Sequence, residues 1–333
     1  MTLPALSASG FRGHLRQPEQ TLGLQLKPGA GAIDWTALDN WLRDKLMLSL
    51  QPYPPGAPCA PAHTPAHAVC KLLWRILQVA AALQRAARIP VFEPGRILAW
   101  QADQTRPGVW LCEVGVAHVD YVPAQSMRLA YDAAAVLVLG VAGEPASFAA
   151  VEPLYQQLET KVLQPLRAVM PVGKSVLPLL ACAHECGIPW RHLGLGIFQL
   201  GWGAHRLCIQ HSKVATDSAL GVAVSQDKWV AAEWLRRAGL PTPKHQLVAS
   251  EAYALAAQVS LGWPLVVKPA DRDRGEGVTV DIVDEAALLA AFRQARSLSS
   301  QVLVERQVSG VCHRLLVVRG EVLYTVKRWP VVA

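Results

Sequence analysis

The sequence predicts a mixed α/β (α+β) protein, in which an N-terminal α+β domain precedes a domain of alternating strands and helices. Apolar residues make up 52% of the 333 residues and charged residues 17%, a balance typical of globular chains with sizeable cores. After residue 227, short apolar runs bounded by glycine or proline alternate with helical patterns. We expect domains over residues 1–165 and 227–333, joined by a glycine-rich connecting segment over residues 166–226.

The net charge and the cysteine content indicate which classes of partner and which cellular compartment to expect. The net charge is +7 and the isoelectric point is near 9.1. The lysines and arginines are dispersed, which disfavours nucleic acid and suits phosphates or an acidic peptide equally well. No run approaches the roughly 18 apolar residues of a membrane span, and residues 1–20 lack the apolar region of a signal peptide. The seven cysteines form no disulfide framework. We therefore expect a cytoplasmic protein with no membrane partner.

Two helices and several strands are expected in the N-terminal domain. Asp34 is a good N-cap for a first helix, whose apolar stripe begins at Trp35 and Leu38. A proline-rich surface loop over residues 51–65 separates it from a second helix over residues 66–88. Short strands are expected at residues 97–100 and 109–113, and the apolar run 133–141 fits either a strand or a buried helix end.

Three short patterns resemble known sites but lack a required partner. His63 and His67 have metal-ligand spacing without a nearby carboxylate or further cysteine, so we favour ordinary surface histidines. Lys174 sits in a Gly-Lys-Ser triplet that resembles a P-loop, but Ala168 occupies the position of the first required glycine. His184 begins a zincin-like triplet whose second histidine is replaced by Ile188. The triplet at Lys174 predicts a helix start, and the one at His184 a helix end.

The C-terminal domain is expected to begin with a capped helix at Asp227, which Gly239 ends. Beyond it we expect strands at 246–248, 265–268, 278–282 and 301–305, and helices at 250–259 and 284–296. A hairpin turning at Arg319 and Gly320 closes the chain. Its apolar face is expected to lack a partner, which predicts association into homo-oligomers or poor solubility.

Two lysines bracket the pattern that carries chemistry. Lys228 stands at the start of a helix and Lys268 at the end of an apolar strand. The loop that follows contains Gly275 and Gly277, which permit positive φ and close approach of backbone N–H groups to phosphate. The strand ending at Glu305 could offer backbone groups to an adenine edge. Each signal is weak alone, but their order is typical of a nucleotide site.

This order of lysine, V-V-K-P, glycine loop and V-L-V-E resembles the ATP-grasp enzymes. The runs Q-L-G-W-G-A-H-R at 199–206 and T-D-S-A-L-G at 216–221 make the chain similar to the ATP-grasp portion of bacterial cyanophycin synthetases over residues 125–333. The resemblance implies ATP, Mg²⁺ and an acidic amino-acid or peptide substrate. It also implies an acyl-phosphate intermediate, attacked by an amine to extend an aspartate-type polymer. In that family the N-terminal region is an accessory domain that holds the polymer.

The resemblance also implies roles for individual residues. Lys228 and Lys268 would contact the α- and β-phosphates. The nucleotide would be covered or read by Asp273, Arg274, Gly275, Glu276, Gly277, Val278, Glu305, Arg306 and Val308. Arg314 and Arg328 match catalytic arginines of the family, although a solvated role is open for each.

Two departures from the family pattern lead to expectations about activity. Cys312 stands where the family has an acidic residue for the ribose hydroxyls. No Asp or Glu follows Glu321, so the family's Mg²⁺ ligands are not found in this sequence. We expect a C-terminally truncated ATP-grasp ligase that is inactive alone. The alternatives are a nucleotide- or polymer-binding pseudoenzyme and a different ATP-grasp peptide ligase.

Overall fold

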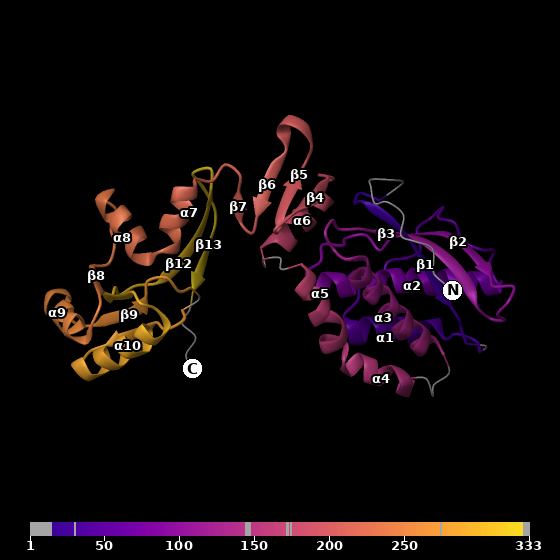
Figure 1. Cartoon of the computed structure of the whole chain (residues 1–333), viewed down its shortest axis with the longest axis horizontal. Helices are drawn as coiled ribbons and strands as arrows, with labels where there is room; N and C mark the ends of the chain where they lie inside the picture. The colour runs from indigo at the N-terminus through magenta and orange to yellow at the C-terminus, as the bar shows by residue number, and fades with distance from the viewer. Residues whose placement is uncertain are drawn as a thin grey trace. The chain divides into compact units, whose positions relative to one another are not determined.

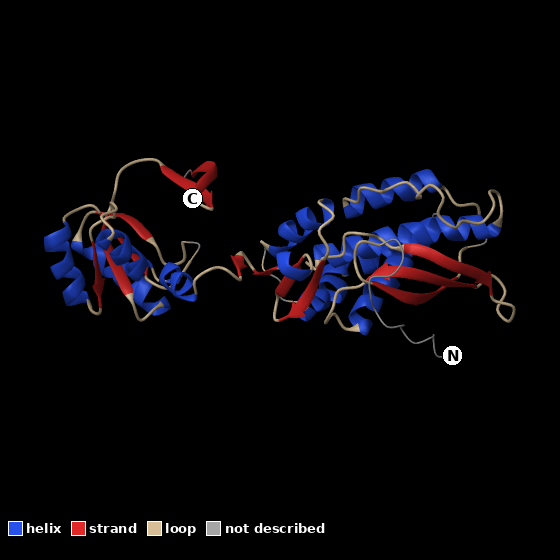
Figure 2. Cartoon of the chain, turned by 90° about the horizontal axis from the view of Figure 1, so that it is seen from above, coloured by secondary structure: helices blue, strands red, loops and turns tan. Residues whose placement is uncertain are grey.

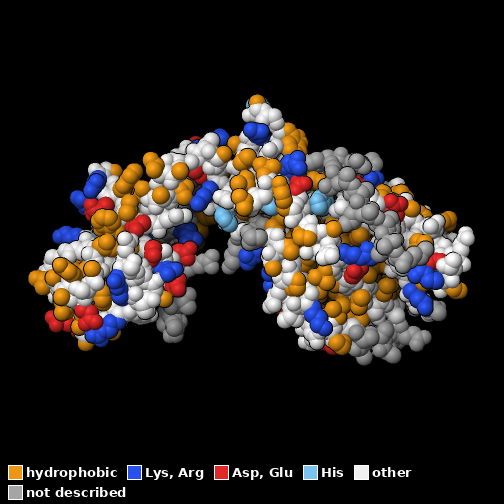
Figure 3. Space-filling model, viewed as in Figure 1, with side chains coloured by type: hydrophobic (Ala, Val, Ile, Leu, Met, Phe, Trp, Pro, Cys, Tyr) orange, Lys and Arg blue, Asp and Glu red, His pale blue; other side chains and the backbone are white. Residues whose placement is uncertain are grey.

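The computed structural model describes residues 15–29, 31–143, 148–170, 173, 175–273 and 275–328. The chain divides into two compact units, residues 1–216 and 217–333 (Figure 1). On the face drawn in Figure 3, Lys and Arg side chains are scattered over both units, as the sequence indicates.

Unit 1 contains a three-stranded antiparallel sheet in the order β1-β3-β2. Its strands are β1 (Glu19–Leu26), β2 (Arg96–Ala102) and β3 (Trp110–Ala117). The pairing of β2 with β3 confirms the two strands expected there. Strand β1 was not expected from the sequence. Its alternate residues Leu22, Leu24 and Leu26 are buried, so this strand contributes one face to the core.

Helices lie along one face of this sheet (Figure 1, Figure 2). The helices of unit 1 are α1 (Trp35–Leu46), α2 (Pro65–Ala86), α3 (Ala124–Ala142), α4 (Phe148–Gln156), a π-helical turn η2 (Glu159–Leu163), α5 (Gln164–Val169) and α6 (Val176–Glu185). Helix α2 contacts β2, and α6 contacts strand β4 (Trp190–Gly194) of a second sheet. Asp34 caps α1 by accepting from the N–H groups of Thr36 and Ala37. The ambiguous run at 133–141 lies inside α3, so the helical alternative holds. Helix α6 begins just after Ser175 and ends just after His184, as expected; Lys174 lies outside the described residues.

Helix α2 is long and apolar enough to cross a membrane by length and composition alone. However, 67% of its most apolar stretch is buried within the structure. Its residues Leu72, Leu73, Ile76 and Leu77 are fully buried in the main core of unit 1. Helix α2 is therefore a core helix around which the unit packs.

A small antiparallel sheet occupies the segment that the sequence suggested was only a connection. Its strands are β4 (Trp190–Gly194), β5 (Ile197–Leu200), β6 (Leu207–Gln210) and β7 (Lys213–Val214), paired in chain order, with a 3-10 turn at Gly203–His205. Trp190 and Phe198 are buried and contact each other edge to face. The glycines of this segment make tight turns between strands, since Gly194, Gly196 and Gly201 all have positive φ.

Unit 2 is a four-stranded antiparallel sheet in the order β10-β9-β11-β8, packed against helices. The strands are β8 (His245–Val248), β9 (Leu265–Pro269), β10 (Thr279–Ile282) and β11 (Val302–Arg306); the helices are α7 (Ala219–Gln226), α8 (Lys228–Arg237), α9 (Glu251–Leu261) and α10 (Glu285–Leu298). Every element expected from the sequence is present, and α7 is an addition. Asp227 caps α8 through the Val230 N–H.

The hairpin of β12 (Cys312–Val318) and β13 (Glu321–Arg328) turns at Arg319 and Gly320, which have positive φ as a tight hairpin turn requires. Every residue of both strands is exposed. Tyr324 is 54% exposed, so the described part of unit 2 leaves the apolar face of this hairpin uncovered.

Candidate functional site

Strands β9 and β11 of unit 2 present two different faces. On one face, Leu265, Val267, Val302 and Val304 join α9 and α10 in the core of the unit. On the opposite face, Lys268 Nζ lies 2.6 Å from the Glu305 Oε1 atom. The register pairs Lys268 with Leu303 and Val266 with Glu305, so the two charged residues are diagonal neighbours on this face. Their side chains are only 20% and 14% exposed, which makes this ion pair partly desolvated.

Lys228 is held at the end of strand β9. Its backbone N–H donates to the Ala270 carbonyl at 3.0 Å, and its Nζ donates to the carbonyl oxygens of Pro269 at 3.0 Å and of Arg272. Burial, followed by the nearby Lys268 ammonium, lowers the pKa of the Lys228 amine, while neighbouring aspartates act in the opposite direction. The two lysines therefore converge closely enough to repel each other, although they come from a helix and a strand.

The glycine loop has a packed base and an open tip. At Gly277, with φ of +67°, an added Cβ would lie 2.7 Å from the Leu298 Cδ1 atom and 3.0 Å from the Pro269 Cγ atom. At Gly275, with φ of +82°, nothing lies within 4 Å of that position. The loop turns through bonds from the Glu276 N–H to the Asp273 carbonyl and from the Val278 N–H to the Gly275 carbonyl. Asp273 and Glu276 are exposed, and Arg274 lies outside the described residues.

The sequence predicts that Arg306 and Val308, at the end of β11, act together with Lys268 at the nucleotide. In the structure, the Arg306 side chain does not lie beside Lys268, because its Nη1 donates to the Leu261 carbonyl and packs against Gly262. The Arg306 N–H donates to the Lys244 carbonyl, and Val308 is 67% exposed. The N–H of Arg306 is already used in this hydrogen bond. An adenine ring bound at the end of β11 would therefore form hydrogen bonds more readily with carbonyl oxygens or with the exposed Val308 backbone.

Arg314 and Arg328 lie on one face of the hairpin, since Cys312 pairs with Arg328 across the ladder and Arg314 follows two residues later. Both are exposed. In the described part of the chain, no hydrogen bond or ion pair joins either arginine side chain to Lys228, Lys268 or the glycine loop. The structure thus brings together the lysines and the base of the loop, but not the arginines.

Sequence reasoning missed two side-chain contacts. Glu305 was expected to act through its backbone, yet its carboxylate holds Lys268. The Gln307 amide forms two hydrogen bonds with Asp281, one to its carboxylate at 2.5 Å and one from its N–H at 2.7 Å. Both contacts depend on strand register, for which the sequence carries no local signal.

The described residues do not fit a divalent metal. They contain no group of three or more His, Cys, Asp or Glu side chains placed to hold one. Mg²⁺ requires several oxygen ligands around one point, and the described residues supply no such group. The residues do fit a phosphate group, because two ammonium groups and an open glycine loop lie at one end of β9.

Curated proteins similar to this chain are ligases. The chain is 32% identical over 161 residues to the cyanophycin synthetase of Trichormus variabilis, a match covering 48% of this chain and 18% of the relative. It is 34% identical over 173 residues to that of Geminocystis herdmanii, covering 50% of this chain and 20% of the relative. It is 41% identical over 105 residues to the D-alanine–D-alanine ligase of Ectopseudomonas mendocina, a match covering 31% of this chain and 33% of the relative. The chain is related to the ATP-grasp ligases.

This relationship covers part of each protein. The chain spans about a fifth of the cyanophycin synthetases that it matches and about a third of the D-alanine–D-alanine ligases. No family model matches the chain. Among solved structures, the D-alanine–D-alanine ligase of Helicobacter pylori matches 31% of the chain and 32% of its own length, at 23% identity and a TM-score of 0.27. The helices and antiparallel sheets of the chain itself confirm the mixed α/β class expected from the sequence.

Proposed function

We propose that unit 2 binds ATP through Lys228 and Lys268 and serves a carboxylate–amine ligase of the ATP-grasp type. The observation that carries this proposal is the convergence of the two amines beside the glycine loop. A helix start and a strand end supply them, and the Lys268 ammonium contributes, after burial, to the lowered pKa of the Lys228 amine. A phosphate between them would relieve their mutual repulsion, and charge-assisted hydrogen bonds to phosphate are strong.

The glycine loop supports the same assignment. Its base is fixed by Gly277 and by the Arg272 guanidinium, whose Nη2 donates to the Leu298 carbonyl at 2.6 Å. Its tip at Gly275 is open, so backbone N–H groups could approach the β- and γ-phosphates without a side chain in the way. We infer that the loop residues 273–278 cover the phosphates and that residues 305–308 contact the adenine. Arg314 and Arg328 would face the acyl phosphate.

The proposed reaction has two steps. A substrate carboxylate oxygen attacks the γ-phosphorus of ATP, the bond to ADP breaks, and an acyl phosphate forms. An amine then attacks the acyl carbon, inorganic phosphate leaves, and the amine loses a proton to give an amide. The lysines would stabilise charge on the phosphates, and the loop would exclude water.

The finer proposal concerns the substrate. We propose that an amino acid is added to an aspartate-type polymer, since the relatives covering about half the chain are cyanophycin synthetases. A different ATP-grasp peptide ligase is the alternative that the D-alanine–D-alanine ligases support. The test is which amino acid promotes ADP release with an aspartate-polymer primer and Mg²⁺; stimulation by D-alanine alone would favour the alternative.

A nucleotide-binding protein without turnover is the second candidate. It is supported by the lack of a metal-ligand group among the described residues. Primer-dependent ADP release by residues 1–333 would contradict it. We also propose a cytoplasmic location, which the seven unpaired cysteines support because disulfides are rare in reducing compartments.

Calorimetry with a non-hydrolysable ATP analogue tests the nucleotide assignment. Lys228→Ala and Lys268→Ala should each weaken binding by about 1.5–3 kcal/mol, the range for a charge-assisted contact. Lys244→Ala is the matched control, because it removes an exposed lysine of unit 2 outside the site. Lys174→Ala should also leave binding unchanged. Equal affinity in all four variants would refute the assignment.

A further inference from the structure

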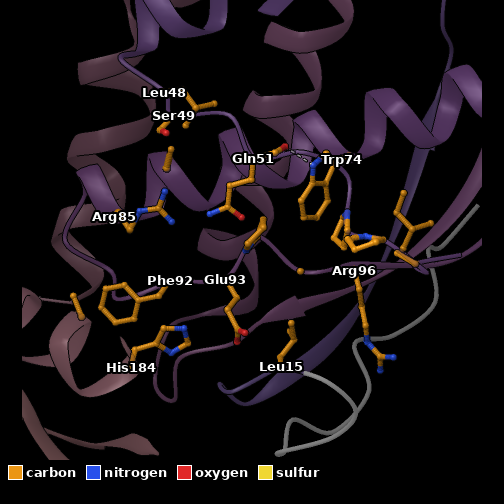
Figure 4. Close-up of a pocket in the computed structure, with 18 of the residues that line it drawn as sticks. Leu15, Leu48, Ser49, Gln51, Trp74, Arg85, Phe92, Glu93, Arg96 and His184 are labelled. Atoms are coloured by element: carbon orange, nitrogen blue, oxygen red, sulfur yellow. Dashed lines mark hydrogen bonds between the residues drawn. The ribbon is translucent and has the colours of Figure 1, made fainter. Parts of the chain in front are cut away.

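Unit 1 contains a cavity of about 1400 Å³ that the nucleotide proposal does not use. Its walls come from five separate parts of the chain: the segment before β1, the loop after α1, helix α2, the segment leading into β2, and the end of α6 (Figure 4). Among the described residues, three charged side chains that line this cavity form no ion pair: Arg85, Glu93 and the exposed Glu185. Two of them, Arg85 and Glu93, are partly desolvated.

The first is Arg85, in the last turn of α2. Its Nη1 donates to the Val91 carbonyl at 2.8 Å, and the side chain points into the cavity in Figure 4. Burial alone lowers the pKa of its guanidinium; no carboxylate is among the causes. Arg96, which also lines the cavity, is different, because its Nη2 lies 2.7 Å from the Glu19 Oε1 atom. Arg85 therefore remains a partly desolvated cation with donors to spare.

The second is Glu93, on the segment leading into β2. Its Oε2 accepts from the Arg16 backbone N–H at 2.7 Å, and burial raises the pKa of its carboxyl group. The Arg16 guanidinium donates to the His184 carbonyl, and its charge lowers the pKa of the Glu93 carboxyl group against the larger effect of burial. The Val91 carbonyl that accepts from Arg85 belongs to a residue two positions before Glu93, so the Cα atoms of Val91 and Glu93 are at most about 7 Å apart. The cavity wall thus carries one positive and one negative side chain that are partly desolvated and form no ion pair with each other.

Apolar and amide groups complete the walls. Trp74 is buried and donates from Nε1 to the Gln51 carbonyl at 2.9 Å, which fixes its ring. Phe92 lies against the His184 ring with centroids 5.4 Å apart. In Figure 4 the Gln51 amide points toward Arg85. These groups would contact the body of a ligand.

We propose that this cavity binds a zwitterionic ligand of the free amino-acid or short-peptide class, with its carboxylate on Arg85 and its cationic group on Glu93. The aromatic rings of Trp74 and Phe92 contact the rest of the ligand. A simple anion would satisfy Arg85 but meet the Glu93 carboxylate, and a simple cation would have the reverse problem. Only a ligand with both charges compensates both partly desolvated groups.

The proposal goes beyond the nucleotide function and does not rest on it. All the cavity residues named here belong to unit 1, whereas Lys228 and Lys268 belong to unit 2. Variants of the cavity should therefore change binding of the zwitterion and leave binding of the ATP analogue unchanged.

The test is calorimetry of the full chain with the dipeptide Gly-Phe, its N-acetylated form and its C-terminal amide. We expect saturable binding of Gly-Phe and a loss of roughly tenfold to a hundredfold on blocking either end. Free phenylalanine and a longer peptide ending in Gly-Phe distinguish a free amino acid from a chain terminus. Absence of saturable binding by every unblocked probe would overturn the proposal without any mutation.

Variants then assign the two ends. Arg85→Gln should bind Gly-Phe and its C-terminal amide equally well, because the partner of the ligand carboxylate is lost. Glu93→Gln should bind Gly-Phe and its N-acetylated form equally well, because the partner of the ligand amine is lost. Lys161→Gln and Glu113→Gln remove exposed charges of unit 1 away from the cavity and should keep the preference for Gly-Phe over both blocked forms. Arg85→Lys, which retains the charge, should keep the preference for Gly-Phe over its amide if Arg85→Gln fails to fold. Preferences that persist in Arg85→Gln and Glu93→Gln would place the ligand elsewhere and overturn the proposal.

Discussion

The ion pair of Lys268 and Glu305 allows one prediction to be worked out from the structure. Its atoms are 2.6 Å apart and its side chains are 20% and 14% exposed, so it lies between a surface pair and a fully buried one. Removing one partner leaves a partly desolvated charge, for which about 2 kcal/mol is a reasonable cost. We expect Glu305→Gln and Lys268→Met each to lower the free energy of unfolding of unit 2 by about this amount.

The double variant is the sharper part of this prediction. Because Lys268→Met with Glu305→Gln leaves no unpaired charge, its cost should be well below the sum of the two single costs. Urea unfolding followed by circular dichroism measures all four proteins, and the coupling should be about 1–3 kcal/mol. Additivity within about 0.5 kcal/mol would refute the interaction described here. The Arg293–Glu251 pair, which is far more exposed, provides a control cycle expected to give less than about 1 kcal/mol.

Three further predictions follow from local geometry and burial. Gly277→Ala should destabilise unit 2 by more than Gly275→Ala, because both have positive φ but only Gly277 is in close contact; equal urea midpoints would contradict this. Burial raises the pKa of Cys112 to about 12, so iodoacetamide should modify the exposed Cys182 and spare Cys112 in the folded chain, as mass spectrometry can check. Burial lowers the pKa of His118, so the unfolded state binds more protons below pH 6.5 and stability should fall as pH drops through that value; His118→Gln should flatten this part of the profile, and an unchanged slope would contradict it.

Much of unit 2 could be predicted because its sequence signals are local. Asp227 and Asp284 cap helices where expected, and the apolar runs ending at Lys268 and Glu305 form strands. The glycine loop also lies where its residues indicated. The direction of the Arg306 side chain could not be predicted, because it depends on which face of β11 is covered by helices.

The parts that sequence reasoning missed depend on contacts between distant segments. Strands β4 to β7 are short and joined by glycine turns, so their composition resembles a loop. The cavity in unit 1 could not be predicted from the sequence. Arg85 and Glu93 become part of one cavity only because the loop after α1 and helix α6 fold next to them. Local patterns therefore predict elements, while pairing between elements determines the sites.

Binding of a non-hydrolysable ATP analogue to the intact chain and to its Lys268→Ala and Lys244→Ala variants tests the central claim most directly. The convergence of Lys228 and Lys268 predicts saturable binding that Lys268→Ala weakens by roughly tenfold or more and that Lys244→Ala leaves unchanged. Equal affinity in the three proteins, or no saturable binding by the intact chain, would contradict a nucleotide site in unit 2.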